Sequence, residues 1–593
     1  MRDRVSPALS GRLSMLALLA CLMGSASASA DAAEQAVAAS VEQQFRAIHE
    51  SEWPWRVREI GIADDVDEAA RIHSRFRDAS AAAQQARQAY LENVLAQLDG
   101  IDPGALAGNT RIDYAVYRAQ IEALLAKYRY RDYEMPLTSS GGFWQHAASH
   151  ARKPYRTEAD YRAYLSLLRA LPAYFEQNIA NMRAGLRRGF TQPRAVLAGR
   201  DAPIVAVANA RPEDTPYYRP FVDMPAALPA PVQAELRKQA RAAIAEAVIP
   251  AYRTLGDFLR DSYVPAARTS LAAYELPDGA AYYRSRIREY VTLDLAPEAI
   301  HDIGLREVAK IRGEMEQAMR ASGFAGDLQG FMEFLRTDPQ FYPSSEKELL
   351  KEAAWIANRF DSIAANWFGR MPRMRFGIRP MPAETAPFSS YAVGGPGYYL
   401  LNTYDLASRP LYVLTALTLH EAAPGHAFQM PLAAENRAQP PFRQKVYMSA
   451  YGEGWALYCE KLGVEMGMYE TPYDRFGMLN YQAWRAARLV VDTGIHAKGW
   501  DRARAIAYMQ QNTSLNQREI ETEVDRYISV PGQALSYYMG MLAIEREREK
   551  AHAALGERFD IRAFHDAVLE AGSVPLPALE LHIDEYLAKA QRQ

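Results

Sequence analysis

Two histidines and a glutamate lie within seven consecutive residues, at His420, Glu421 and His426. They follow a largely apolar run that begins at Leu411. A hydrolytic zinc site needs neutral imidazoles as ligands, a carboxylate that takes a proton from water, and an open coordination position. The three residues supply the imidazoles and the carboxylate, so this stretch predicts metal-dependent hydrolysis.

The spacing of the histidines departs from the usual zinc-peptidase helix, in which they stand four positions apart on one face. On an unbroken helix, the separation of His426 from His420 turns the second side chain roughly a third of a turn away from the first. Pro424 cannot donate a backbone hydrogen bond, and Gly425 beside it is conformationally free. We therefore expect a bulge at these two residues that returns His426 to the side of His420. The alternative is a helix that stops at Ala423 and leaves two unrelated histidines.

A third ligand is expected in the segment GEGWALYCEKLG, where Glu453 stands between two glycines. Glycine permits close backbone approach, and two histidines with one glutamate form a donor set found at catalytic zinc sites. Glu460 lies on a similar helical face and is expected to support the ligands. The alternative for Glu453 is a glutamate near a helix N-terminus that only complements the helix dipole.

A polar strip is expected on the helix that contains RAARLVVDTGIHAKGW. Arg488, Asp492 and His496 are spaced by four and share one face of this otherwise largely apolar helix. Such side chains must be hydrogen-bonded if they are buried. In the functional interpretation, Asp492 orients a ligand or a catalytic group and His496 stabilises charge that develops on the substrate. The alternative is a salt bridge that includes a surface histidine.

The segment EVDRYISVPGQALSYYMG carries Arg526, Tyr527 and Tyr537 around a helix break. An arginine can bind a peptide carboxylate through two parallel hydrogen bonds, and a tyrosine hydroxyl can donate to an oxyanion. We expect Arg526 to bind substrate and one of the two tyrosines to be catalytic. The chain has 35 tyrosines, each with a packing alternative, so the sequence does not choose between Tyr527 and Tyr537.

Short aromatic and aliphatic runs between glycines and prolines predict a small β-sheet at about residues 373–402, immediately before the histidine-bearing helix. A sheet edge can align an extended peptide by strand addition. We therefore expect the stretch from Gly394 to Asn402 to border the substrate cleft, with Gly397, Tyr398 and Asn402 in contact with substrate. The alternative is a purely structural hairpin.

The rest of the chain is dominated by helical periodicity, with apolar residues at three- and four-residue intervals as in ARQAYLENVLAQL. The expected fold class is mainly α, a large multi-helix enzyme with the small sheet packed next to the metal-binding helix. Residues 31–593 are expected to form one large region, either undivided or as two lobes around a cleft, with the catalytic part at about 370–545. The net charge of −3 gives no reason to expect nucleic acid as a partner.

The N-terminus has the three parts of a secretory signal peptide: arginines, an apolar run and a stretch of small residues. We expect residues 1–30 to be removed by cleavage after Ala30, with lipoprotein processing at Cys21 as the alternative. Cleavage after Ala30 leaves Cys459 as the single cysteine, which excludes an internal disulfide. No other apolar stretch reaches the roughly 18 residues of a membrane span. A periplasmic or secreted protein is therefore expected.

Four motifs in this order, HEAAPGHAFQ, GEGWALYCEKLG, RAARLVVDTGIHAKGW and EVDRYISVPGQALSYYMG, resemble the bacterial family named domain of unknown function 885 (DUF885). That family is regarded as metallopeptidase-like and similar in outline to zinc peptidases that take two histidines from a helix and a glutamate from a later helix. The resemblance implies His420, His426 and Glu453 as metal ligands and Glu421 as the general base. It implies no particular substrate.

Together these interpretations predict an exported hydrolase that holds one zinc ion per chain and cleaves peptide bonds. Two alternatives stay open. One is a metal-dependent amidase that acts on a non-peptide or isopeptide amide. The other is a non-catalytic periplasmic binding protein in which the helix breaks at Pro424 and no site assembles. The expected partner is a peptide or a small amide, and the sequence indicates no oligomeric state.

Overall fold

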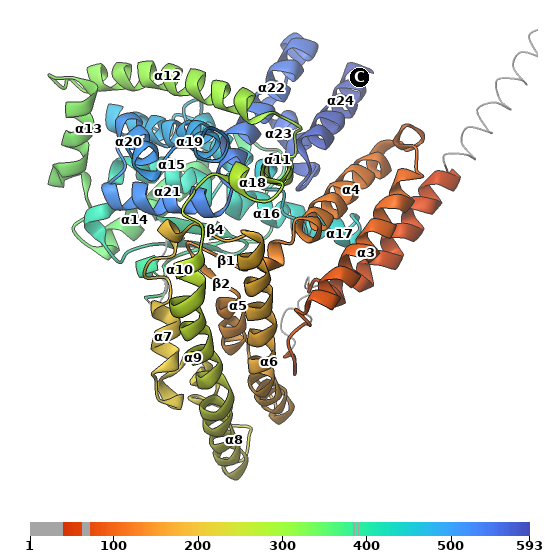
Figure 1. Cartoon of the computed structure of the whole chain (residues 1–593). Coiled ribbons are helices and arrows are strands. Elements are labelled where there is room, and N and C mark those ends of the chain that lie inside the picture. The colour runs from red at the N-terminus through yellow and green to blue at the C-terminus, as the bar shows by residue number, and fades with distance from the viewer. Residues whose placement is uncertain (1–38, 62–71, 384–385, 389–390, 593) are drawn as a thin grey trace, which may run out of the picture.

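Helices dominate the computed structural model, which describes residues 39–61, 72–383, 386–388 and 391–592 (Figure 1). The expected mainly α class with a small sheet is confirmed. The signal peptide expected at residues 1–30, including Cys21 and Ala30, lies outside the described residues. None of the helices in the described ranges is both long and apolar enough to span a bilayer.

The first half of the chain forms helices of very different lengths. A helix over residues 39–59 comes first. It is followed by α3 Ala81–Asp99, α4 Gly108–Arg129, α5 Phe143–Ser149, α6 Glu158–Arg188, α7 Ala202–Ala208, α8 Ala230–Ala243, α9 Ile249–Phe258, α10 Val264–Ala266, α11 Gly279–Val291 and α12 Pro297–Ala321.

The second half contains the helices that carry the chemistry-bearing residues. They are α13 Leu328–Thr337, α14 Glu346–Ile363, α15 Leu414–Glu421, α16 His426–Glu435, α17 Pro441–Gln444, α18 Ser449–Leu462, α19 Pro472–Lys498, α20 Arg502–Asn512, α21 Gln517–Ser529, α22 Ser536–Leu555, α23 Ile561–Glu570 and α24 Leu576–Arg592.

The predicted β region forms a three-stranded sheet of β3 Gly377–Pro380, β4 Ala392–Gly395 and β5 Tyr398–Leu401. Strand β5 is in the middle, parallel to β3 and antiparallel to β4. Strand β4 is therefore an edge strand, and it packs against α15 and α16. A second sheet pairs β1 Leu137–Thr138 with β2 Gly141–Gly142.

Two large apolar cores hold the described residues together. One draws its side chains from the helix at 39–59, α3, α4 and the helices from α11 onwards. The other lies between Leu137 and Ala267, and helices α6, α8 and α9 of this core extend away from the rest of the molecule in Figure 1. Whether the chain divides into two lobes around a cleft stays a prediction.

The helices at the centre of the first core are buried nearly all round. In α15 every residue from Leu414 to His420 is buried, and in α19 the buried residues run from Phe476 to His496. Helices with apolar residues on all faces belong in a core. Polar side chains on α15 and α19 are therefore held in fixed positions by packing.

Candidate metal centre

His420 and His426 lie on either side of a helix break. Helix α15 ends at Glu421, and α16 begins at His426. The peptide bond before Pro424 in the intervening turn is cis. The expected bulge within one continuous helix is therefore wrong, because the chain ends one helix and starts another.

Two contacts hold this turn in place. The indole Nε1 of Trp455 donates to the carbonyl oxygen of Pro424 at 2.8 Å. A side chain at Gly425 would place its Cβ 1.8 Å from the carbonyl oxygen of His420. Only glycine fits at that position, so the chain can double back tightly enough to start α16 beside the end of α15.

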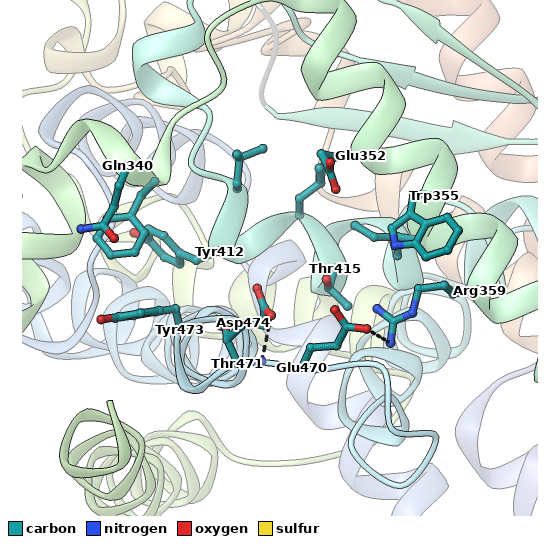
Figure 2. A pocket seen from close by; sticks show the side chains of 14 residues that line it. Gln340, Glu352, Trp355, Arg359, Tyr412, Thr415, Glu470, Thr471, Tyr473 and Asp474 are labelled. Carbon is teal, nitrogen blue, oxygen red and sulfur yellow. Dashed lines mark hydrogen bonds and ion pairs between the residues drawn. The ribbon is translucent and has the colours of Figure 1, made fainter. Parts of the chain in front are cut away.

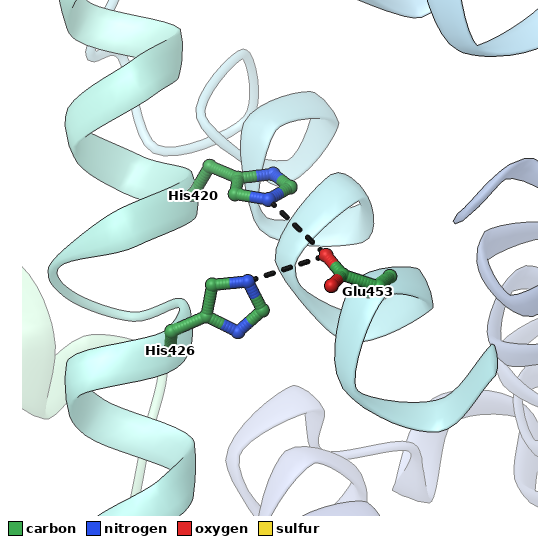
Figure 3. A group of neighbouring side chains, drawn as sticks. All are labelled: His420, His426 and Glu453. Carbon is green, nitrogen blue, oxygen red and sulfur yellow. Dashed lines mark ion pairs between the residues drawn. The ribbon is translucent and has the colours of Figure 1, made fainter. Parts of the chain in front are cut away.

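The two histidine rings converge despite the break. Their centroids lie 4.9 Å apart at an interplanar angle of 88°. Figure 3 shows both rings facing Glu453 of α18, whose Oε2 lies 3.6 Å from Nε2 of His420 and 3.3 Å from Nε2 of His426. The alternative of two unrelated histidines is therefore contradicted.

The geometry of the three donors fits a metal ion. Tetrahedral zinc with bonds of about 2.1 Å holds its ligand atoms roughly 3.4 Å apart. The measured separations of 3.3 and 3.6 Å match that spacing, and one ligand atom from each of His420, His426 and Glu453 lies within 4.8 Å of the others. Among the described residues this is the group of histidine and acidic side chains that could hold a metal.

Glu460 contacts His420 from the side away from Glu453. Its Oε1 lies 2.8 Å from Nδ1 of His420, and because a carboxylate only accepts, Nδ1 donates and Nε2 is left for the centre. Burial lowers the pKa of His420, but hydrogen bonds to Glu453 and Glu460 outweigh this and raise the pKa to about 9. Arg485 lies 3.6 Å from Glu460. The site thus carries an excess of buried carboxylate around two imidazoles.

Glu421, the predicted general base, is held by the sheet. The backbone N–H of Gly394 in β4 donates to Oε2 of Glu421 at 2.6 Å. A Cβ at Gly394 would lie 1.8 Å from the carbonyl oxygen of Glu421, so strand and helix touch through their backbones. This contact fixes the carboxylate beside the turn that joins the two histidine helices.

The two glycines around Glu453 each make room for a neighbour. A Cβ at Gly452 would meet the ring of Tyr447 at 2.4 Å, and one at Gly454 would meet the backbone of Gly540 in α22 at the same distance. Without those side chains, the Tyr447 hydroxyl donates to Oε1 of Glu453 at 3.0 Å. Helices α18 and α22 then pack in direct backbone contact.

That close packing brings Tyr537 of α22 to the centre. Its ring lies parallel to that of His420, with centroids 6.4 Å apart. Burial and the charge of Glu453 raise the pKa of Tyr537, while Arg488 and Arg526 oppose the rise. Of the two tyrosines that the sequence leaves open, Tyr537 is the one that lies beside the three candidate ligands.

The hydroxyl of Tyr527 is fully hydrogen-bonded to other side chains. Its hydroxyl accepts from Nε1 of Trp484 at 3.0 Å and from Nε of Arg488 at 2.9 Å, and it donates to Glu523 at 2.7 Å. One donor and two acceptor sites are thereby used, so none remains for an oxyanion. The expected catalytic role does not fit this geometry.

Arg488 and Arg526 share a single acid. Both nitrogens of the Arg526 fork bond to Glu523, at 3.1 and 2.8 Å, and Nη1 bonds to Gln533. Arg488 also donates to Glu523, at 2.8 Å. The fork expected to bind a substrate carboxylate is therefore occupied, although the two arginines leave one net positive charge beside Tyr537.

Asp492 and His496 hold the backbone of neighbouring segments. Asp492 accepts from the hydroxyl of Tyr283 at 2.5 Å and from the N–H of Gly532 at 3.1 Å. The two ring nitrogens of His496 bond to the backbone N–H of Ala273 and to the carbonyl oxygen of Tyr527. The expectation that Asp492 orients a ligand and that His496 stabilises substrate charge is corrected, because both are used in packing.

The sheet presents a different part of the predicted substrate stretch. Asn402 is fully buried, and its amide donates to the carbonyl oxygen of Ala386. Tyr398 begins the middle strand, and Gly397, with φ of 86°, forms the turn before it. Asn402 is therefore structural, and it is Gly394 of the edge strand that contacts Glu421 beside the candidate metal centre.

Residues 54–583 match a family described as bacterial protein of unknown function, DUF885. The chain belongs to the DUF885 family. The resemblance drawn from the four motifs is confirmed.

Two solved structures are similar to this DUF885 chain over most of its length. A putative lipoprotein from Colwellia psychrerythraea is 27% identical with a TM-score of 0.82, and the alignment covers 94% of this chain and 99% of that one. A putative lipoprotein of unknown function from Shewanella oneidensis is 18% identical with a TM-score of 0.65, covering 91% and 99%. An M32 carboxypeptidase from Deinococcus radiodurans R1 aligns at 13% identity over 86% and 100%, but its TM-score of 0.29 is too low to establish a common fold. No curated protein matches the chain.

Three residues of this DUF885 protein make contacts at the candidate centre that the sequence did not predict. Arg485 stands three positions before Arg488, so extending the polar strip by one turn would have found it. Gly394 lies inside the predicted substrate stretch, but nothing local marks its contact with Glu421. Tyr447 precedes α18, and the only hint in the sequence of its contact with Glu453 is the glycine at position 452, which leaves room for its ring.

Proposed function

We propose that the protein is an exported zinc-dependent peptidase. The observation that carries the proposal is the spacing of the donor atoms of His420, His426 and Glu453, which matches tetrahedral zinc, next to a carboxylate on Glu421.

Each residue has a separate task in the proposed reaction. His420, His426 and Glu453 would hold the zinc ion, which when bound would supply Lewis-acid polarisation and make nearby water more acidic. Glu421 takes a proton from water and passes it to the leaving amine. Glu460 keeps His420 in the tautomer that leaves Nε2 free. Tyr537 donates its hydroxyl proton as a hydrogen bond to the carbonyl oxygen as charge develops there.

The edge strand β4 supports an extended peptide as the substrate. Gly394 turns its N–H away from β5 and towards Glu421, so in the antiparallel ladder the carbonyl of Gly394 and both backbone groups of Ala392 also face away from β5. Val393 on the same strand is 44% exposed and offers an apolar surface. An incoming strand would pair with β4 and bring its scissile bond to Glu421.

Export is supported by the N-terminal sequence and by the names of the two similar structures, which are both called putative lipoproteins. Cleavage after Ala30 and lipid attachment at Cys21 give different mature N-termini. Mass spectrometry of the protein from membrane and soluble fractions distinguishes them. An unprocessed N-terminus beginning at Met1 in both fractions contradicts export.

The test of the proposed function is Glu421→Gln. The change keeps the shape of the side chain but removes its basicity, so peptide hydrolysis should fall by roughly 10²–10⁴-fold while one zinc per chain is retained. Products are mapped on a mixed peptide library, with small acyl amides as the competing substrate class. Wild-type turnover by the variant contradicts the role of Glu421. Cleavage of acyl amides without any peptide cleavage favours the amidase alternative.

A further inference from the structure

A cavity of about 320 Å³ lies at the N-terminal end of α15, away from the metal centre (Figure 2). Its walls are α14, the short helix η10 (Pro339–Phe341), η14 (Leu411–Val413) with the first turn of α15, and residues 470–474 at the start of α19. None of the residues that line it belongs to the candidate metal centre. Thr415 in its wall and His420 are about 140° apart around the helix axis and roughly 8 Å apart along it. The volume lies within the range of small-ligand sites.

The cavity is negatively charged. Glu352, Glu470 and Asp474 line it, and among its described lining residues the single cation is Arg359, paired with Glu470 at 3.0 Å. Glu352 is exposed and forms no ion pair within the described ranges. Burial raises the pKa of Asp474, hydrogen bonds from Thr471 oppose the rise, and the charge of Glu470 adds to it. Three acids against one arginine leave the described lining of the cavity with a net negative charge.

Aromatic rings form much of the remaining wall. Trp355 on α14 is 57% exposed, which is unusual for so large an apolar side chain, and it stands at the rim beside Glu352 in Figure 2. Phe341, Tyr412 and Tyr473 also line the cavity, and Figure 2 shows Tyr412 and Tyr473 on the side away from Trp355. Aromatic faces attract organic cations, so the rings and the carboxylates select the same sign of charge.

A buried hydroxyl points into the same space. Thr415 is only 6% exposed, and its side chain has no hydrogen-bond partner among the described residues. It lines the cavity together with Glu470 and Asp474. A hydroxyl can accept a hydrogen bond from an ammonium group. A ligand with such a donor would therefore find an available acceptor in the cavity wall.

The three acids of the cavity do not gather around one point. Within the described part of the chain, the group of acidic and histidine ligand atoms that gathers to within 4.8 Å is the one at His420. The three carboxylates of the cavity are therefore too far apart to coordinate one ion together. A longer molecule with two separate positive charges can pair with carboxylates that lie apart.

We propose that this cavity is a binding site for a small aliphatic diamine. One ammonium group lies between Glu470, Asp474 and the hydroxyl of Thr415, and the other lies near Glu352 and the face of Trp355. The alkyl chain between them covers the apolar wall formed by Leu411 and Leu414. The site is independent of the metal centre and of the proposed peptidase activity.

The experiment uses three probes with the same chain length: 1,5-diaminopentane, 1,5-pentanediol and glutarate. Titration calorimetry on the metal-loaded full chain should detect saturable binding of the diamine alone. Binding should weaken roughly threefold in Glu352→Gln because one exposed charge pair is lost. It should weaken roughly fivefold in Trp355→Ala because the cation–π contact is lost. Glu557→Gln, an exposed acid on another surface, is the matched control and should bind as the wild type does.

A diamine could also coordinate the catalytic zinc, so the titration is repeated on His420→Ala. Unchanged binding to that variant assigns the diamine to the cavity, and loss of binding there overturns the proposal. Equal binding of the diol, or a diamine affinity unchanged in both Glu352→Gln and Trp355→Ala, also overturns it. Because Glu352 is exposed and unpaired, its variant stays informative even where Trp355→Ala folds poorly.

Discussion

The metal centre and the polar strip of α19 use the same residue types at helical spacing, but their hydrogen bonds differ. At the centre, the Nε2 atoms of His420 and His426 both point at one carboxylate oxygen, and Nδ1 of His426 has no hydrogen-bond partner in the described part of the chain. On the strip, both ring nitrogens of His496 are bonded to backbone groups. One arrangement leaves lone pairs directed at a shared point, and the other leaves none.

The electrostatics of the two regions differ in the same direction. Neighbouring carboxylates raise the pKa of His420 to about 9 despite its burial, whereas burial lowers the pKa of His496 to about 3. The surroundings therefore favour positive charge at His420 and disfavour it at His496. Residue type and spacing therefore identify candidates, and the partners of each polar atom decide what a candidate can do.

The largest effect is expected from replacing one histidine of each region by alanine. His420→Ala should reduce zinc from about one per chain to near zero, with loss of peptide hydrolysis, because three donors become two. His496→Ala should keep its zinc but lose roughly 1–3 kcal/mol of stability, because buried backbone groups lose their partners. Elemental analysis and thermal unfolding measure both quantities. Equal zinc content in the two variants would remove the distinction between the regions.

The two tyrosines give the next test. Tyr537→Phe should lower kcat by roughly 10²-fold with zinc unchanged, because a donor to the developing oxyanion is lost. Tyr527→Phe should leave kcat near the wild-type value while the protein unfolds at a lower temperature, since Glu523 and Arg488 lose a partner. Steady-state kinetics and thermal unfolding are measured on both. The reverse pattern would place Tyr527 in the chemistry.

Glu460 tests whether orientation of a ligand matters. Glu460→Gln should weaken zinc affinity by roughly 10–100-fold, the usual cost of losing a carboxylate that holds a ligating histidine. Competition with a chelator measures the affinity. Glu547→Gln, which changes a glutamate of similar burial on α22, is the control and should bind zinc normally. Equal affinities in the two variants would contradict the role of Glu460.

The last test concerns the pH dependence of stability. Burial raises the pKa of Asp492 from 3.8 to about 7, and hydrogen bonds from Tyr283 and Gly532 oppose the rise only in part. The folded state therefore holds a proton that the unfolded chain releases above about pH 4. Stability from this group is full below that pH and is lost as the pH rises towards 7, by roughly 1.4 kcal/mol per pH unit.

Asp492→Asn removes this titration while keeping an acceptor for its partners. Relative to the wild type, the unfolding temperature of the variant should rise by a few degrees between about pH 5 and about pH 8. Thermal scans at several pH values measure the difference. Asp257→Asn, which changes an exposed carboxylate of α9, should show no such trend. A constant difference for Asp492→Asn across the range would contradict the raised pKa.

Local sequence predicted what depends on local geometry. Glu453 and Glu460 are seven positions apart, so helical periodicity alone places both on one face, and both reach His420. The convergence of His420 and His426 could be expected from Pro424 and Gly425, although not the two-helix form that it takes.

Tertiary contacts decided the rest. Tyr537 and Tyr527 look equivalent along the chain, and only the backbone contact between Gly454 and Gly540 brings one of them to the centre. Four-residue spacing placed Asp492 and His496 on one face of α19. It carried no information about the segments that this face meets, which present the backbone N–H of Gly532 in a turn and the backbone carbonyl of Tyr527 in α21.

The bond from Gly394 to Glu421 makes the position of the Glu421 carboxylate independent of the side chains on β4. It is made by a backbone N–H, so it survives any change of neighbouring side chains on β4 that leaves the glycine itself in place. In the proposed peptidase, a substitution at Val393 would change the surface offered to a peptide without removing the bond that holds Glu421. Substrate preference and the position of the carboxylate could then change independently of each other.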